Sequence, residues 1–284
     1  MGARYDYRTL DVEEDADLDV TAQTRNWDAV SGNAGVLYRV AEPVALVANV
    51  GRGFRAPSNS DLFSNGVHEG TVSFEKGDPN LAVETSLNSD VALRVQTHRV
   101  SAEVGGFLND IQDFIYTRPT GEIDPESGFE IFQAVQGNAQ LAGYEASAEI
   151  HPVRQIHISV SSDFVRGDNT DTDAPLPWIP PVRALYGVRY EPDSLGWAES
   201  PYIGIRGESV AKQTRLDPLD TTVPSYTLAH ADAGVTIPVG AHPLAFDVGA
   251  HNLFDKSYRD FMSRFKTYAL APGRNITVRL TMHF

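Results

Sequence analysis

The chain has 284 residues, a formal net charge of −15 and no cysteine. The negative charge argues against non-specific binding to nucleic acid, and the absence of cysteine excludes disulfides and thiol chemistry. No apolar run approaches the roughly 18 residues that a transmembrane helix needs. Residues 1–10 lack the basic and apolar regions of a signal peptide, so we expect any export signal to precede this sequence.

Apolar and polar residues alternate along most of the chain, which is the pattern of β-strands with two different faces. We expect a strand at each end, one near residue 30, and others between them, for a total of about twelve. In chain order the internal strands are 43–54, 88–98, 99–111, 143–152, 155–165, 182–192, 202–210, 227–238 and 243–254.

The predicted connections alternate between short and long. Short turns fall at 41–43, 97–99, 152–154 and 238–243, with a somewhat longer one near 191–199. Long polar loops fall at 11–25, 55–80, 118–128, 167–181, 212–224 and 255–273. Such alternation is typical of outer-membrane barrels, which have short periplasmic turns and long extracellular loops. A soluble β-sandwich has similar strands but no reason to alternate its connections.

The two faces of the predicted strands differ in the way that lipid and lumen require. Along 141–151 one face is apolar or aromatic and the other carries charge; the first has Ala142, Tyr144, Ala146, Ala148 and Ile150, the second Gly143, Glu145, Ser147, Glu149 and His151. The last stretch, 275–284, alternates in the same way and ends on Phe284. The sequence therefore predicts an all-β, transmembrane, antiparallel up-and-down barrel.

Several stretches of the sequence carry recognisable motifs. The first two are "GRGFRAPSNSDLF" (51–63) and "GDPNLAVETSLNSDVALR" (77–94), and the later ones are "NAQLAGYEASAEI" (138–150), "HNLFDKSYRDF" (251–261) and "APGRNITVRLTMHF" (271–284). Together they resemble TonB-dependent receptors of the outer membrane, in which the first two are similar to a strand end, a loop and the opening of the next strand, and the others to later strands. We expect the glycines and prolines of these motifs to shape the barrel rim.

The resemblance implies a function and a set of partners. Residues 1–284 match the C-terminal half of a receptor barrel of 22 strands, without the plug domain. The intact receptor would take up a scarce ligand, a metal, siderophore or haem, with energy from the TonB complex acting through the missing plug. Other implied partners are outer-membrane lipid and the barrel assembly machinery, for which Phe284 would be the signal. No resident cofactor is expected.

The long loop 55–80 holds side chains that suit a divalent metal. It contains His68, Glu69, Glu75 and Asp78, and imidazole with carboxylate suits Zn²⁺. The order of residues in this loop resembles that in zinc receptors, and also that in siderophore and haem receptors. We take His68 and Glu69 as candidate metal ligands, which other loops would have to complete; the alternative is an ordinary solvated loop.

A siderophore or haem cargo would use aromatic and basic loop residues instead. Phe74, Arg264 and Tyr268 are the candidates. The acidic run 11–19 lacks the spacing of an EF-hand, so we expect it to be solvated. His151, His157, His230, His251 and His283 face the lumen but show no ligand spacing, and we expect most to be satisfied by hydrogen bonds.

Other function classes remain alternatives. An even number of strands would allow closure as a stand-alone outer-membrane pore, and a non-functional truncated receptor is also compatible with the sequence. An outer-membrane enzyme is less favoured, because Ser159 and Ser161 share a face with His157 without a nucleophile elbow or a triad pattern. An autotransporter would need a helical segment at residues 1–10, which instead read as a strand.

Overall fold

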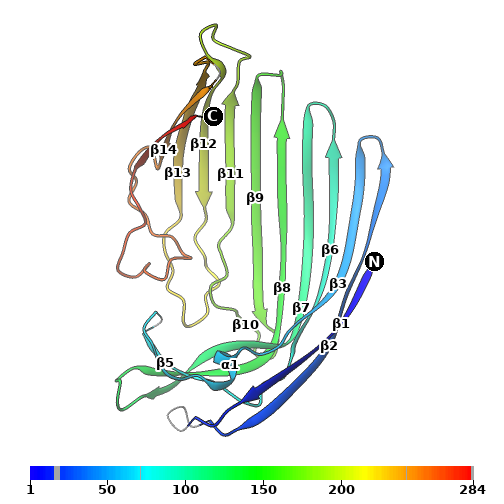
Figure 1. The fold of residues 1–284 in the computed structure, drawn as a ribbon, viewed down its shortest axis with the longest axis vertical. Helices are drawn as coiled ribbons and strands as arrows, with labels where there is room; N and C mark the ends of the chain where they lie inside the picture. The colour runs from blue at the N-terminus through cyan, green and yellow to red at the C-terminus, as the bar shows by residue number, and fades with distance from the viewer. Residues whose placement is uncertain (16–19, 71, 241, 283–284) are drawn as a thin grey trace.

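The computed structural model describes residues 1–15, 20–70, 72–240 and 242–282, and these form one large curved sheet (Figure 1). Fifteen strands belong to the sheet, and all but β4, β5 and β10 follow one another as neighbours in chain order. These twelve are β1 (Gly2–Val12), β2 (Gln23–Ala41), β3 (Val44–Arg55), β6 (Glu84–Gln96), β7 (Val100–Ile123), β8 (Glu130–Ile150), β9 (Ile156–Asn169), β11 (Arg183–Tyr190), β12 (Glu199–Val210), β13 (Tyr226–Ile237), β14 (Leu244–His251) and β15 (Asn275–Met282). The expectation of about twelve up-and-down strands is confirmed.

The remaining elements belong to the long connections. The helix α1 (Asn59–Phe63) and the hairpin β4 (Asn65–His68) and β5 (Ser73–Lys76) lie between β3 and β6. The short strand β10 (Ala174–Pro175) folds back on β9. Among the described strands, β5 with β8 is the one parallel pair. No helix in the described residues is long and apolar enough to cross a membrane.

Short and long connections lie at opposite edges of the sheet, as the sequence predicted (Figure 1). One predicted loop is wrong in its extent, because β7 continues to Ile123 and β8 begins at Glu130, where a loop was expected at 118–128. The two strands extend beyond their neighbours, and β5 supplies part of β8 with a further partner by pairing Phe74 with Ile131 and Lys76 with Gln133. The predicted loops 212–224 and 255–273 carry no strand in the described structure.

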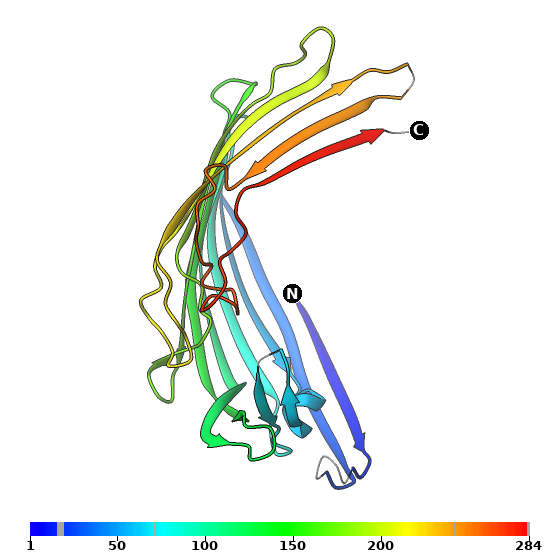
Figure 2. The ribbon, with the colours of Figure 1, turned by 90° about the vertical axis from the view of Figure 1, so that its left-hand side faces the viewer.

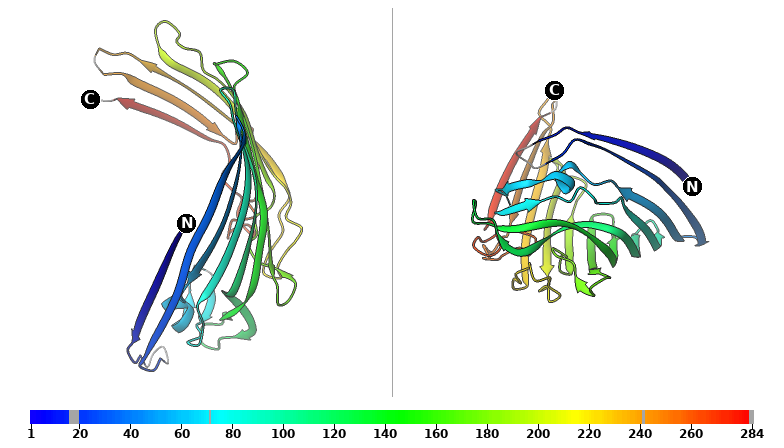
Figure 3. Two further views of the ribbon diagram at one scale, coloured as in Figure 1. Left: turned by 90° about the vertical axis from the view of Figure 1, so that its right-hand side faces the viewer. Right: turned by 90° about the horizontal axis from the view of Figure 1, so that it is seen from below.

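The sheet is open in the described part of the chain. The two end strands, β1 and β15, each have a single neighbouring strand, and they do not pair with each other. Figure 2 shows the sheet as a curved wall, with α1, β4 and β5 on its concave side. The same elements lie inside the arc when the molecule is seen from below (Figure 3). Closure as a twelve-stranded barrel, which the sequence left open, is not observed.

The strand register separates an apolar face from a polar face. Ile150, Ile158, Val188, Ile205, Ala231, Ala250 and Ile276 are successive Cα partners from β8 to β15. One residue along, the partners are Glu149, Ser159, Gly187, Arg206 and His230. Since side chains alternate between faces, the apolar face and the polar face each run across the sheet, which confirms the predicted pattern.

Buried side chains gather where the long connections pack onto the sheet. One cluster joins Leu62 and Leu81 to Trp27, Ile115 and Ala134 of the strands. A second places Leu176 of the β9–β11 connection against β7 and β8. In a third, Tyr258 of the β14–β15 loop packs on β12 and β13. The loops are therefore fixed to the barrel wall by their own apolar residues, which positions the candidate site.

Candidate functional site

The segment that follows β3 is held in a fixed shape by its motif residues. Ser58 caps α1 and forms a capping box with Asp61, and Leu62 and Pro57 are almost fully buried. Gly77 closes this segment, because its N–H donates to the carbonyl of Ser64 at 2.7 Å. A Cβ on Gly77 would lie 2.4 Å from the carbonyl carbon of Leu62, so the close approach requires glycine.

Two family-like motifs meet through one ion pair. The Arg55 guanidinium donates to Glu84 at 2.9 Å and to Asp61 at 3.0 Å. The same Glu84 oxygen accepts from the backbone N–H of Ile115 at 3.0 Å. The Glu84 side chain is only 14% exposed. Arg55 and Glu84 thus tie β3, α1, β6 and β7 together, in agreement with a structural role for the motifs.

Replacing Glu84 with glutamine is expected to destabilise the folded barrel. Glutamine removes the charge that Arg55 faces and keeps one oxygen for the acceptor role. Charged hydrogen bonds of this kind contribute about 1.5–3 kcal/mol, so a loss in that range is expected in urea unfolding of the intact protein in vesicles. The matched control is Glu103→Gln, because Glu103 pairs with Arg94 at 2.7 Å while both are about half exposed. The control should cost less than Glu84→Gln does, because an exposed ion pair is screened by water; equal losses would contradict the assigned role.

The predicted metal loop forms the β4–β5 hairpin. The Nδ1 of His68 lies 3.9 Å from Oε1 of Glu75, and the His68 side chain is 59% exposed. Glu69 is exposed next to it. Asp78 is placed differently, because its Oδ1 accepts from the backbone N–H of Asn80 at 2.8 Å and forms a turn. The structure therefore brings His68 and Glu75 together and gives Asp78 a role in the loop backbone.

The other predicted residues belong to a cluster that joins three long connections. Lys266 lies 3.5 Å from Asp220, and the two side chains are 4% and 1% exposed. The Lys266 ammonium is 4.2 Å from the ring centroid of Trp178 and donates to the carbonyl of Phe261 at 3.0 Å. The backbone N–H of Trp178 donates to Asp220 at 3.0 Å. The β10–β11, β12–β13 and β14–β15 connections are therefore locked together.

Arg264 and Tyr268 lie on the outside of this cluster. The Arg264 guanidinium sits 5.3 Å from the ring centroid of Trp178. Tyr268 is 73% exposed, and its ring is 5.8 Å from that of Phe265. The arrangement offers a cation and exposed aromatic rings to solvent at the long-loop edge, which suits an anionic or aromatic ligand.

A carboxylate also fixes the turn between β9 and β10. Asp171 accepts from the backbone N–H of Asn138 at 2.6 Å and from its side-chain amide at 2.9 Å. These bonds hold the pKa of Asp171 below its usual range, the backbone bond contributing most. A carboxyl whose pKa falls on folding stabilises the structure above its unfolded pKa, and this contribution is lost as the pH falls through the folded value. The turn should therefore be well ordered at neutral pH.

A large open hollow lies along the strands β6 to β9, mostly on the polar face of the sheet. Its volume is about 900 Å³, and its lining includes Asp90, Glu103, Glu145, Asp163 and Arg183. Arg183 and Asp163 pair across β11 and β9 at 3.1 Å. A space of this size with paired charges can hold water or a polar solute, which is the property expected of a barrel lumen.

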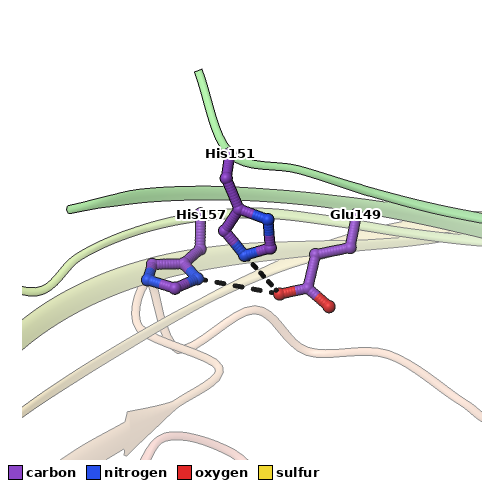
Figure 4. Close-up of side chains that lie close together, drawn as sticks. All are labelled: Glu149, His151 and His157. Carbon is purple, nitrogen blue, oxygen red and sulfur yellow. Dashed lines mark ion pairs between the residues drawn. The ribbon is translucent and has the colours of Figure 1, made fainter. Parts of the chain in front are cut away.

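Three residues that the sequence did not single out as ligands converge at the opposite edge. Glu149, His151 and His157 place one ligand atom each within 4.8 Å of the others, the one such group of three or more found in the described ranges. Figure 4 shows both imidazoles directed at one carboxylate oxygen of Glu149. The sequence showed no ligand spacing for His151 and His157, and the structure brings the two imidazoles to one carboxylate.

Of the other lumen histidines, His230 has the expected hydrogen bond. His230 accepts from the backbone N–H of Asn252 at 3.3 Å. The rings of His230 and His251 are 5.4 Å apart. His283 and Phe284 lie outside the described residues, so the assembly signal stays a prediction.

Comparisons with known proteins identify what the chain resembles. A family model described as "TonB dependent receptor-like, beta-barrel" matches residues 1–253. The vitamin B12 transporter BtuB of Vibrio vulnificus (strain YJ016) is 27% identical over 244 residues, which are 86% of this chain and 35% of that protein.

Solved structures share the fold. The copper transporter OprC superposes with a TM-score of 0.77 at 22% identity, over 92% of this chain and 40% of the other. The FrpB iron transporter from Neisseria meningitidis (F3-3 variant) gives 0.68 at 15% identity, over 98% and 41%. The siderophore receptor PirA from Acinetobacter baumannii gives 0.66 at 20% identity, over 89% and 41%. The chain thus spans well under half the length of each of these relatives.

Proposed function

The chain belongs to the TonB dependent receptor-like β-barrel family, and on this premise we propose that it forms part of the wall of an outer-membrane receptor for a scarce nutrient. The observation that carries the proposal is the continuous apolar face opposite a polar face with a hollow of about 900 Å³. A lipid-facing surface and a hydrated lumen require this division. Strands and a plug outside residues 1–284 would complete the barrel.

In this proposal the parts of the chain have separate tasks. The apolar face contacts outer-membrane lipid, and the loops at the long-loop edge capture the ligand. The TonB complex acts on the plug and therefore reaches this chain only indirectly. Phe284 is the signal for the barrel assembly machinery. The relatives compared above are transporters and receptors by name, which supports a receptor and not an enzyme.

Uptake by intact cells tests the proposed function. The probes are radiolabelled Zn²⁺, Cu²⁺, a ferric catecholate siderophore, haemin and cobalamin, because the relatives are named for metal, siderophore and vitamin cargoes. Cells with the intact protein should accumulate one probe, and a protonophore should abolish the accumulation. If every probe accumulates equally in cells without the protein, the proposed function is wrong.

For the cargo we favour a divalent metal held in part by the β4–β5 hairpin, since His68 and Glu75 already face each other at 3.9 Å. Glu69 is the second candidate metal ligand of this loop, and Asp78 shapes its base. The alternative cargo is a siderophore or haem that contacts Phe74, Arg264 and Tyr268. That alternative is supported by the cation and exposed rings at the long-loop edge.

Substitutions in the hairpin separate the two cargoes. His68→Ala and Glu75→Ala are each expected to weaken zinc binding by the intact protein about tenfold or more, because each removes a direct ligand. Calorimetric titration measures the change in a background that carries His151→Ala and His157→Ala, so that the two imidazoles beside Glu149 do not contribute. His98→Ala, an exposed histidine in the β6–β7 turn, should leave the affinity unchanged. Unchanged zinc affinity in both hairpin variants would remove the metal assignment of this loop and leave the siderophore or haem alternative.

A further inference from the structure

A cluster of metal-ligating side chains lies at the short-turn edge, far along the strands from the long loops. Glu149 is near the end of β8, His151 follows it, and His157 is near the start of β9, so the cluster spans one turn. Glu149 pairs with Ser159 and Ile150 with Ile158, so the same register sets His151 opposite His157. The three side chains share the polar face because they are separated by even numbers of positions along paired strands.

The distances suit a shared metal ion. The Nε2 of His151 lies 3.1 Å from Oε1 of Glu149, and the Nδ1 of His157 lies 3.7 Å from the same oxygen (Figure 4). Two ligand atoms about 2.0–2.1 Å from one tetrahedral zinc ion lie roughly 3.4 Å apart. The two observed distances bracket that value, and the two ring centroids are 4.5 Å apart. The His151 and His157 side chains are 29% and 28% exposed, so they have room to move. Small movements of these side chains would complete a tetrahedral arrangement of ligands.

A second carboxylate orients one of the imidazoles. The Nε2 of His157, on the side of the ring away from Glu149, lies 3.4 Å from Oε2 of Glu191. Glu191 is in turn paired with Arg189. Metal-binding histidines commonly donate their other ring N–H to a carboxylate, which fixes the tautomer and strengthens the ligand. Glu191 is placed to keep the proton on Nε2 and leave Nδ1 free for a metal.

The surroundings leave room for further ligands. Glu149 and His157 line a hollow of about 550 Å³ on the polar face, together with Ser159, Asp232 and the two arginines that pair with Asp232, Arg189 and Arg206. Two imidazoles and one carboxylate with an open position are a ligand set that zinc and its neighbours in the transition series accept.

The geometry points to a divalent transition-metal site that accepts zinc, formed by Glu149, His151 and His157 and oriented by Glu191. Water or a passing solute would take the fourth position. The inference is separate from the proposed uptake function, since a metal bound here need not be the cargo. It places a cation on the lumen side, at the end of the barrel opposite the ligand-capturing loops.

Zinc titration of the intact protein in detergent micelles tests the site. The background carries His68→Ala and Glu75→Ala, so the loop hairpin cannot contribute. One zinc ion should bind, and His151→Ala or His157→Ala should each weaken it at least tenfold. Glu191→Gln should weaken it about tenfold to a hundredfold, because it removes only the orienting carboxylate. His98→Ala and His230→Ala are the matched controls and should bind as the background does.

A second measurement identifies the ligands directly. With Cu²⁺ as the probe, electron paramagnetic resonance of the background should show coupling to two nitrogens, and His157→Ala should show one. Heat-modifiable gel mobility checks that each variant is folded. If folded His151→Ala and His157→Ala bind zinc as tightly as the background, or if the copper spectrum is the same in both, the site does not exist. Either result leaves the uptake experiment, which uses cells and other probes, unaffected.

Discussion

Replacing Lys266 with methionine is expected to release the long loops from one another. In the described part of the chain, Lys266 is the one cation paired with Asp220, and this change removes it. The side chains of Lys266 and Asp220 are both less than 5% exposed. Removing one member of a buried ion pair costs about 3–5 kcal/mol, because the remaining charge stays buried. Methionine keeps most of the length and apolar area of the lysine stem, so packing against Trp178 and Phe261 changes little.

The effect should be local. Proteinase K digestion of the folded intact protein in membranes should cut Lys266→Met faster than the wild type within 212–224 and 255–273. Lys256→Met changes an exposed lysine of the same loop and should be cut like the wild type. Adding Asp220→Asn to Lys266→Met removes the orphaned charge while keeping an acceptor for the Trp178 N–H, so protection should partly return. Loops that stay protected in Lys266→Met would show that the pair does not hold them.

An arginine introduced on one face of β9 is expected to lower the stability of the barrel much more than an arginine on the other face. Val160 is 48% exposed on the apolar face, opposite Ala148 and Tyr186. Its neighbour Ser161 is on the polar face and lines a hollow with Glu149 and Glu208. Arginine facing lipid costs roughly 2–4 kcal/mol at the bilayer midplane. Val160→Arg should therefore lose that amount in urea unfolding of the intact protein in vesicles, whereas Ser161→Arg finds water and carboxylates and should lose little.

This pair of substitutions is sensitive to register. A shift of one residue exchanges the two faces of a strand, so it would reverse the order of the two variants. Equal losses would mean that both faces of β9 meet the same environment. In that case the apolar face would not be a lipid-facing surface.

Strand positions were predictable because each strand carries its own signal. The alternation along 141–151 assigns Ala146 and Glu145 to different faces without any knowledge of neighbours, and the register bears this out. The extent of β7 and β8 was not predictable, because their outer ends gain support from β5, a partner that is distant in sequence. Whether the sheet closes depends on whether β1 and β15 pair with each other, and no single stretch of sequence indicates this.

The candidate sites depended on contacts between segments. The pairing of Lys266 with Asp220 joins residues 46 positions apart, and no spacing in the sequence indicates it. The cluster of Glu149, His151 and His157 had a usable signal, since a tight turn at 152–154 between two strands sets His151 opposite His157. Each histidine considered alone gives no sign of this cluster. His68 and Glu75 were found by their proximity in sequence, and the hairpin register then explains why they meet.

A cysteine scan along residues 158–163 of β9 tests most directly whether this sheet is a membrane wall. The chain has no cysteine of its own, so each introduced residue is the one labelling site in it. A bimane label on each, followed by refolding of the intact protein into vesicles with brominated lipid, reports contact with acyl chains. Labels at 158, 160 and 162 should be quenched, and those at 159, 161 and 163 should not. Quenching that does not alternate, or that is absent throughout, would contradict the account.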